Sequence, residues 1–270
     1  IRTPIRLLRL VFTQSFGVRI MAYTNIDDPS AYFQTALYTG TGNELVVTND
    51  GNSDLQPDFI WIKNRTDAST NHHAVNTSIG STRNLFVNKT DYEEGQAQSV
   101  KSIQSDGFTL GTWDGDNINA KNFVAWQWKA NGGTTASNTT GSVDSVVQAN
   151  TDAGFSIVTF DSASSGNFSV GHGLGVQPAM IITKNREGTS QWYAWHKSLT
   201  GGDSNTSYLV SFNRTDEEAS YANAWGAGVT SSVFGMQSGN TATASNDYIA
   251  YCFAEKQGYS KFGSYVGNGN

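Results

Sequence analysis

The sequence predicts an all-β protein built from two tandem antiparallel β-sandwich domains, and three observations lead to this prediction. Short runs of aromatic and β-branched residues alternate with stretches rich in Gly, Ser, Thr and Asn, which is typical of strands joined by turns. Aromatic residues make up 12% of the chain and charged residues only 15%, so there is much apolar surface to bury. The third observation is an internal repeat.

The repeat is centred on a strand motif that the chain contains twice. Residues 56–65 read QPDFIWIKNR and residues 177–186 read QPAMIITKNR, with six of the ten positions identical at an offset of 121 residues. A fixed offset indicates one structural unit built twice, and this period is far longer than a solenoid unit. We therefore expect each copy to be a domain with its own core.

The two expected domains cover residues 30–131 and 153–257. In the first we expect strands at 33–38, 44–48, 59–63, 85–88, 107–110 and 122–129. Within residues 59–62 the apolar side chains alternate, with Phe59 and Trp61 on one face and Ile60 and Ile62 on the other, so both faces should be covered. In the second domain, residues 155–160 match 33–38 and residues 247–254 match 122–129.

The remaining segments flank these two domains. Residues 1–29 are an N-terminal arm or leader, with Met21 interpreted as the start of the protein; a short basic anchoring arm is the alternative, since residues 1–20 hold four arginines. Residues 132–152 read as a linker with some extended structure around residues 143–147. Residues 258–270 read as the first strand of a third repeat. Phe262, Tyr265 and Val266 of that strand could instead complete a unit in another subunit.

Composition excludes several classes of function. The net charge of −6 argues against nucleic-acid binding, which needs a basic surface. Cys252 is the single cysteine, so no internal disulfide can form. No apolar stretch approaches the roughly 18 residues that a membrane span requires. We expect neither nucleic acid nor membrane among the partners.

The polar side chains predict no catalytic or cofactor site. The histidines, at positions 72, 73, 172 and 196, do not have zinc-site spacing. Asp114 and Asp116 resemble part of a calcium loop without its later glutamate, so a plain turn is favoured over a structural calcium ion. The carboxylates at 91, 93 and 94 recur at 216–218 and read as a solvated acidic loop. We expect a protein that is not an enzyme.

Surface recognition is the remaining possibility for a site. Trp113, Trp192, Trp195 and Trp225 lie near turn-rich segments, and aromatic rings there suit contacts with sugars or proteins, although half or more of them should be core residues. Arg65 and Arg186 end the repeated strand. Their recurrence after Lys-Asn favours a structural turn or cap, with surface recognition as the alternative.

Several phrases in this sequence resemble a known repeat family. They are the Gln-Pro strand with its Lys-Asn-Arg end, DGFTLG at 106–111, WQWKANGG at 126–133, GYSKFGSY at 258–265, and the opening MAYTNIDDP at 21–29. In order and in repetition they are similar to the tandem domains of uncharacterised structural proteins of marine tailed phages, and the resemblance extends from Met21 to the end of the chain. It implies a lectin-like, concanavalin-like jelly-roll fold and a fibre or adhesin role, and it assigns no catalytic residues.

The resemblance sets the functional expectation. We expect a non-enzymatic virion protein, made in the host bacterial cytoplasm and placed on the virion exterior as a fibre or adhesin that contacts the host surface. Its expected partners are itself, as a trimer by analogy or an open polymer, other virion proteins, and a host cell-surface glycan or protein. One alternative is a head-decoration or filament subunit assembled by strand addition. A second alternative is a carbohydrate-active enzyme.

Overall fold

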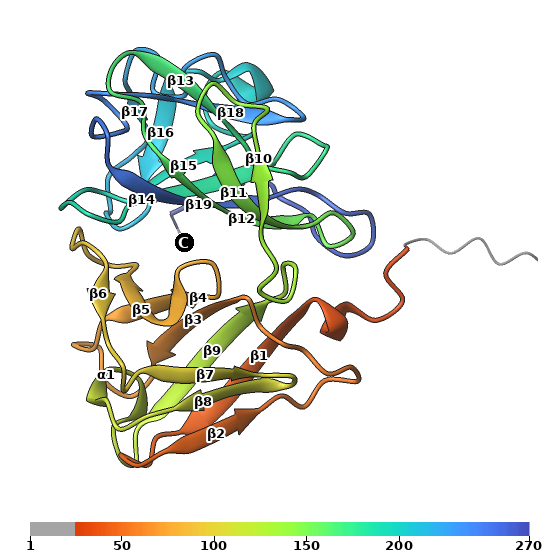
Figure 1. The fold of residues 1–270 in the computed structure, drawn as a ribbon, viewed down its shortest axis with the longest axis vertical. Coiled ribbons are helices and arrows are strands. Elements are labelled where there is room, and N and C mark those ends of the chain that lie inside the picture. Colours follow the sequence, from red (N-terminus) through yellow and green to blue (C-terminus); the bar gives the residue numbers. More distant parts are fainter. Residues whose placement is uncertain (1–24, 270) are drawn as a thin grey trace, which may run out of the picture.

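In a computed structural model, which describes residues 25–269, the chain forms two β-sandwich units stacked one on the other (Figure 1). The only regular helices among these residues are an α-helical turn, α1 (Asp114–Asn117), and two 3-10 turns, η1 (Pro29–Ala31) and η2 (Gly202–Ser204). All strands within the sheets pair antiparallel with their neighbours. The predicted all-β class with antiparallel β-sandwich character is therefore confirmed.

The first unit pairs a large sheet with a small one. The large sheet has the strand order β1 (Phe33–Thr39), β9 (Asn122–Trp128), β3 (Phe59–Asn64), β4 (His72–Asn76), β5 (Gly80–Phe86) and β6 (Glu94–Gly95). The small sheet has the order β2 (Leu45–Thr48), β8 (Gly107–Leu110) and β7 (Val100–Gln104). Between the sheets lies a core that includes Ile60, Ile62, Phe108, Leu110 and Phe123.

The second unit has a similar plan, with two more strands in its large sheet and one fewer in its small sheet. Its large sheet has the order β10 (Ala136–Asn138), β11 (Ser145–Asn150), β12 (Phe155–Asp161), β19 (Asp247–Phe253), β14 (Met180–Asn185), β15 (Tyr193–His196), β16 (Tyr208–Ser211) and β17 (Ala219–Ser220). Its small sheet pairs β13 (Asn167–Gly171) with β18 (Val233–Gln237). The core between them includes Phe160, Phe168, Trp195, Trp225 and Phe234.

The two large sheets repeat one strand order. The series β1-β9-β3-β4-β5-β6 corresponds to β12-β19-β14-β15-β16-β17, strand for strand. Both Gln-Pro strands, β3 and β14, lie beside the closing strand of their own unit, β9 and β19. This is the arrangement that a unit built twice would give.

A third apolar core joins the two units. It lies between the outer faces of the two large sheets and contains Phe59, Ala74 and Leu85 of the first unit with Ile182, Ile249 and Tyr251 of the second. Phe59 and the half-buried Trp61 face this core, while Ile60 and Ile62 face the core of their own sandwich. The prediction that both faces of this strand are covered is confirmed, and the cover on the outer face is the second unit (Figure 1).

Two segments differ from the sequence-based expectation. Residues 132–152 were expected as a linker with some extended structure around 143–147. The extended part is confirmed as β11, but β10 and β11 extend the second large sheet, and β11 pairs with β12 along six residues, Ser145–Asn150. These strands are rich in small polar residues, which are also typical of linkers, although Val147 is a buried core residue. The strand expected at 258–270 does not form among the described residues: a bridge joins Lys256 to Ser260, and residues 261–269 belong to no strand. Met21 and Asn270 lie outside the described residues.

Candidate functional site

Three of the four tryptophans expected near binding loops are core residues. Trp192, Trp195 and Trp225 are no more than 1% exposed. Each indole N–H donates to a backbone carbonyl, at 2.9 Å from Trp192 to Phe86, 3.1 Å from Trp195 to Asn205 and 2.9 Å from Trp225 to Tyr208. Buried indoles need such partners, and these backbone carbonyls supply them. Surface recognition by these three is therefore wrong, whereas the expectation that half or more are core residues is confirmed.

Trp113 lies half-buried immediately before α1, over the ring of His73, with ring centroids 4.6 Å apart. Below it, Asp116 is fully buried and bonds His73 Nδ1 through one oxygen and Ser99 Oγ through the other. A calcium ion at Asp114 and Asp116, the alternative raised from the sequence, would have to displace both partners. Among residues 25–269 no group of three His, Cys, Asp or Glu side chains is placed to hold a metal ion.

The cluster of Ser99, His73 and Asp116 has the composition of a hydrolytic triad but not its geometry. In a triad the serine bonds the imidazole and the carboxylate bonds the other imidazole nitrogen. Here Ser99 bonds the carboxylate itself, and all three side chains are at most 2% exposed. The cluster ties β4, the start of β7 and α1 together. Sequence reasoning missed it, because the three residues lie in different strands and turns without a motif.

The repeated Lys-Asn-Arg segment forms matching turns after β3 and β14. Asn64 Oδ1 accepts the backbone N–H groups of Thr66 and Asp67, each at 2.9 Å. Asn185 Oδ1 accepts those of Glu187 and Gly188, also at 2.9 Å. The interpretation of a structural turn is thereby confirmed in both copies.

The two arginines that follow these turns have different environments. Arg65 is exposed. Arg186 is 21% exposed and reaches across to the first unit, with its Nε 2.6 Å from Glu93 Oε2, and its Nη1 lies 3.5 Å from Asp247 Oδ2. Arg186 therefore holds the two units together, while Arg65 stays available for surface contacts.

Lys184 adds a buried cation to the junction between the units. Its Nζ donates to the carbonyls of Thr90 in the first unit and Ser190 in the second, both at 2.9 Å. Burial lowers the pKa of this amine to about 8, and the carboxylate of Asp91 opposes that shift. Its partners are fixed carbonyls, so it positions the acidic loop of the first unit against the second.

Asp58 holds the chain where it leaves the first unit, and Tyr251 makes a hydrogen bond across the interface between the units. Buried Asp58 accepts the backbone N–H groups of Ala130, Gly132 and Gly133 at 2.7–2.8 Å. The Tyr251 hydroxyl accepts a hydrogen bond from Asn76 Nδ2 at 3.0 Å, and burial raises its pKa. The Asn76–Tyr251 hydrogen bond crosses between the units within an apolar interface, and its defined geometry favours one relative placement.

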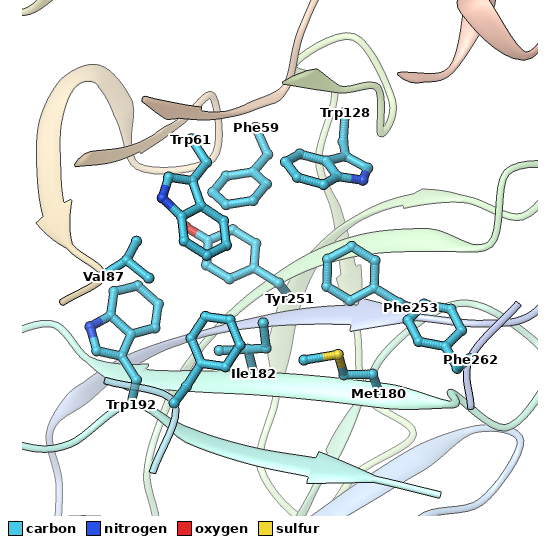
Figure 2. A pocket seen from close by; sticks show the side chains of 11 residues that line it. Phe59, Trp61, Val87, Trp128, Met180, Ile182, Trp192, Tyr251, Phe253 and Phe262 are labelled. Carbon is cyan, nitrogen blue, oxygen red and sulfur yellow. The ribbon is translucent and has the colours of Figure 1, made fainter. Parts of the chain in front are cut away.

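An aromatic cavity lies at the same junction (Figure 2). It has a volume of about 240 Å³. It is lined by Phe59, Trp61, Val87, Trp128, Met180, Ile182, Trp192, Phe212, Tyr251, Phe253 and Phe262. A second cavity of about 230 Å³ adjoins it and shares Trp128, Phe253 and Phe262. Phe262 thus lines both cavities from the C-terminal segment, whereas Tyr265 and Val266 are 94% and 95% exposed.

The large sheet of the first unit ends in an open edge. β1 pairs with β9 over all seven residues, and no other strand among residues 25–269 pairs with its far side. The corresponding strand β12 has β11 on that side. Leu37 on β1 is 65% exposed. An edge of this kind can pair with a further strand.

Comparisons with known proteins place the chain without assigning it a role. A family model described as "Domain of unknown function (DUF7483)" matches residues 28–270, which is nearly the whole chain and includes both units. No curated protein and no solved structure matches it. Within residues 25–269, no helix is long and apolar enough to cross a membrane.

Proposed function

The chain belongs to the DUF7483 family, and from its sequence and architecture we propose that it is a non-enzymatic phage virion protein, an exterior fibre or adhesin that contacts the host surface. The observation that carries the proposal furthest is the joint core of the two units. Interfaces between domains of one chain are usually small and polar, and they permit relative motion. This one is apolar, and it stacks Phe59 on Tyr251 with ring centroids 4.2 Å apart.

A stiff pair of units suits a protein that presents binding loops at a distance from a particle. Besides the stacked rings, the Arg186–Glu93 ion pair and the Lys184–Thr90 hydrogen bond cross the junction. Contacts of several chemical kinds resist both bending and sliding, so the loops at the two ends keep a fixed separation. In this proposal the stiffness holds the binding loops at a distance from the particle. Repeated copies in an oligomer would add multivalency.

Light scattering of the purified protein and a binding assay on host cells test the proposal together. We expect a discrete trimer that sediments with host cells, and we expect saturable binding that free unlabelled protein competes away. Arg65→Glu reverses the charge of an exposed side chain and should weaken binding to host cells. Lys101→Glu, on the small sheet, is its control and should leave binding unchanged. A monomer that leaves host cells unlabelled at micromolar concentration would contradict the proposal.

A second candidate, a filament or head-decoration subunit assembled by strand addition, is favoured by the open edge of β1. The exchanged strand would come from residues 258–270 of another copy, whose Tyr265 and Val266 are suited to a strand. Deleting residues 258–270 and, separately, Leu37→Lys should each abolish assembly, with Val46→Lys, which is 59% exposed on β2, as the control. Unchanged particle mass in both variants would eliminate this candidate.

A further inference from the structure

We propose that the cavity at the junction of the two units binds a small, uncharged aromatic molecule of about two fused rings. The inference rests on the walls, polarity, size and entrance of the cavity, and it is independent of the proposed virion role.

The walls of the cavity come from both units. Trp61 on β3 and Trp128 on β9 lie on one side, and Met180 and Ile182 on β14 with Phe253 on β19 lie on the other (Figure 2). Ring pairs bridge the units around it: Trp61 with Phe212, 5.7 Å between centroids, and Trp128 with Phe253, 6.2 Å. Because these pairs belong to the core that joins the units, the cavity is a fixed part of the junction.

The polarity of the lining restricts the ligand. All eleven lining side chains are apolar or aromatic. The Trp192 N–H is committed to the Phe86 carbonyl and the Tyr251 hydroxyl to Asn76, whereas the Trp61 N–H is buried without a hydrogen-bond partner. A sugar or an ion would lose most of its hydrogen bonds to water here without replacement, at a cost of about 1–3 kcal/mol per unsatisfied group. The chemistry therefore selects an uncharged ligand with few polar atoms.

The size and the ring faces select a planar aromatic molecule. The cavity measures about 240 Å³, whereas a dry apolar cavity of about 150 Å³ suffices for benzene. Eight of the lining side chains carry aromatic rings, and rings prefer offset-stacked or edge-to-face contacts with other rings. Two fused rings would use more of this surface than one ring or an aliphatic chain.

Phe262 controls the entrance. It is half-buried, and its ring centroid lies 6.2 Å from those of Phe253 and His196. Its backbone N–H donates to exposed Glu255 at 3.0 Å. The following residues, 263–269, are exposed and form no strand or helix. Phe262 can therefore swing away without breaking a sheet hydrogen bond, and a ligand can enter past it.

Titration calorimetry of the whole protein with indole, an uncharged two-ring probe, tests the proposal. We expect saturable binding of one indole per chain and no heat from glucose at the same concentration. Met180→Trp should fill the cavity from a half-buried position and weaken indole binding at least tenfold. Val46→Trp, on the exposed face of β2, should leave the affinity unchanged.

A second filling variant guards against misfolding. Val87→Phe should weaken binding as Met180→Trp does, and thermal unfolding identifies whichever variants are folded. Phe262→Ala should accelerate indole association several-fold in stopped-flow experiments. Full indole affinity in a folded filled variant, glucose binding that displaces indole, or no indole binding at millimolar concentration would each overturn the proposal. An unchanged association rate in Phe262→Ala would contradict the inference that the ligand enters past Phe262.

Discussion

At the scale of single residues, His172 shows what burial does to a titrating group. It is fully buried; its Nδ1 accepts the Leu174 backbone N–H and its Nε2 donates to the Thr230 carbonyl, both at 3.2 Å. Only the neutral imidazole can make this pair of bonds. Burial lowers the pKa from 6.5 to about 4, and the bond to Thr230 opposes that shift.

This depressed pKa predicts a loss of stability in mild acid. Between pH about 6.5 and 4 the unfolded chain binds a proton at this histidine and the folded chain does not, so the free energy of unfolding falls as the pH falls. The loss should approach about 3 kcal/mol by pH 4. His172→Gln should remove this part of the pH dependence. Urea unfolding between pH 4 and 7 measures it.

The control for this prediction is His196→Gln. His196 is half-buried, and burial lowers its pKa as well, but it lies at the end of β15 and donates no bond to a core carbonyl. Its replacement should leave the slope of stability against pH nearly as it is in the parent. Parallel slopes for the parent and His172→Gln would contradict the argument.

At the scale of elements, the turns that end β3 and β14 are the best test of the repeat. Each asparagine side chain accepts two backbone N–H groups that have no other partner in the turn. Asn64→Ala and Asn185→Ala should each lower the free energy of unfolding by about 1–2 kcal/mol, since both leave donors unsatisfied. Asn43→Ala, in the exposed turn after β1, should cost less than about 0.5 kcal/mol.

Chemical denaturation of the three variants decides the outcome. Equal losses at Asn64 and Asn185 would support one turn used twice. A loss at one site alone would mean that the sequence identity of the two motifs does not extend to their energetics.

Individual strands also show how much of the fold could be predicted from the sequence. Alternation in residues 59–62 predicted a strand with two covered faces, because the pattern depends only on local geometry. Which part of the molecule covers the outer face of this strand depends on how one unit packs on the other, and no local pattern encodes that. Extended structure was expected around β11, but its place in the second large sheet was not, because its single buried valine, Val147, lies among small polar residues. The burial of the tryptophans near turn-rich segments could not be predicted residue by residue, because it depends on tertiary packing: Trp192 packs in the core between the units, and Trp195 and Trp225 pack in the core of the second sandwich.

The candidate site was less predictable than the fold. Phe59 and Trp61 were expected on one face of a strand, and Tyr251 and Phe253 lie in the segment 247–254 that was matched to a strand, but the cavity exists only where faces of the two units meet. Phe262 was expected in a strand, and it instead packs on Phe253 and lines the cavity. These are tertiary contacts between segments that are distant in the sequence, and composition and periodicity carry no information about them.

At the scale of the whole molecule, the joint core predicts that the two units unfold together. The stacked rings of Phe59 and Tyr251 and the hydrogen bond from buried Lys184 to Thr90 are lost when either unit opens. Calorimetry should therefore show one transition, with the calorimetric enthalpy equal to the van't Hoff enthalpy.

Weakening the joint core should separate the units. Phe59→Ala removes the ring stacked on Tyr251 and should cost about 3–5 kcal/mol. Because that cost falls on the junction and leaves the core within each sandwich complete, the single transition should split into two. Leu37→Ala, at an exposed position on the first unit, is the matched control and should keep one transition. Two transitions in the unaltered protein would mean that the units are independent, and the stiffness on which the fibre or adhesin proposal rests would be lost with them.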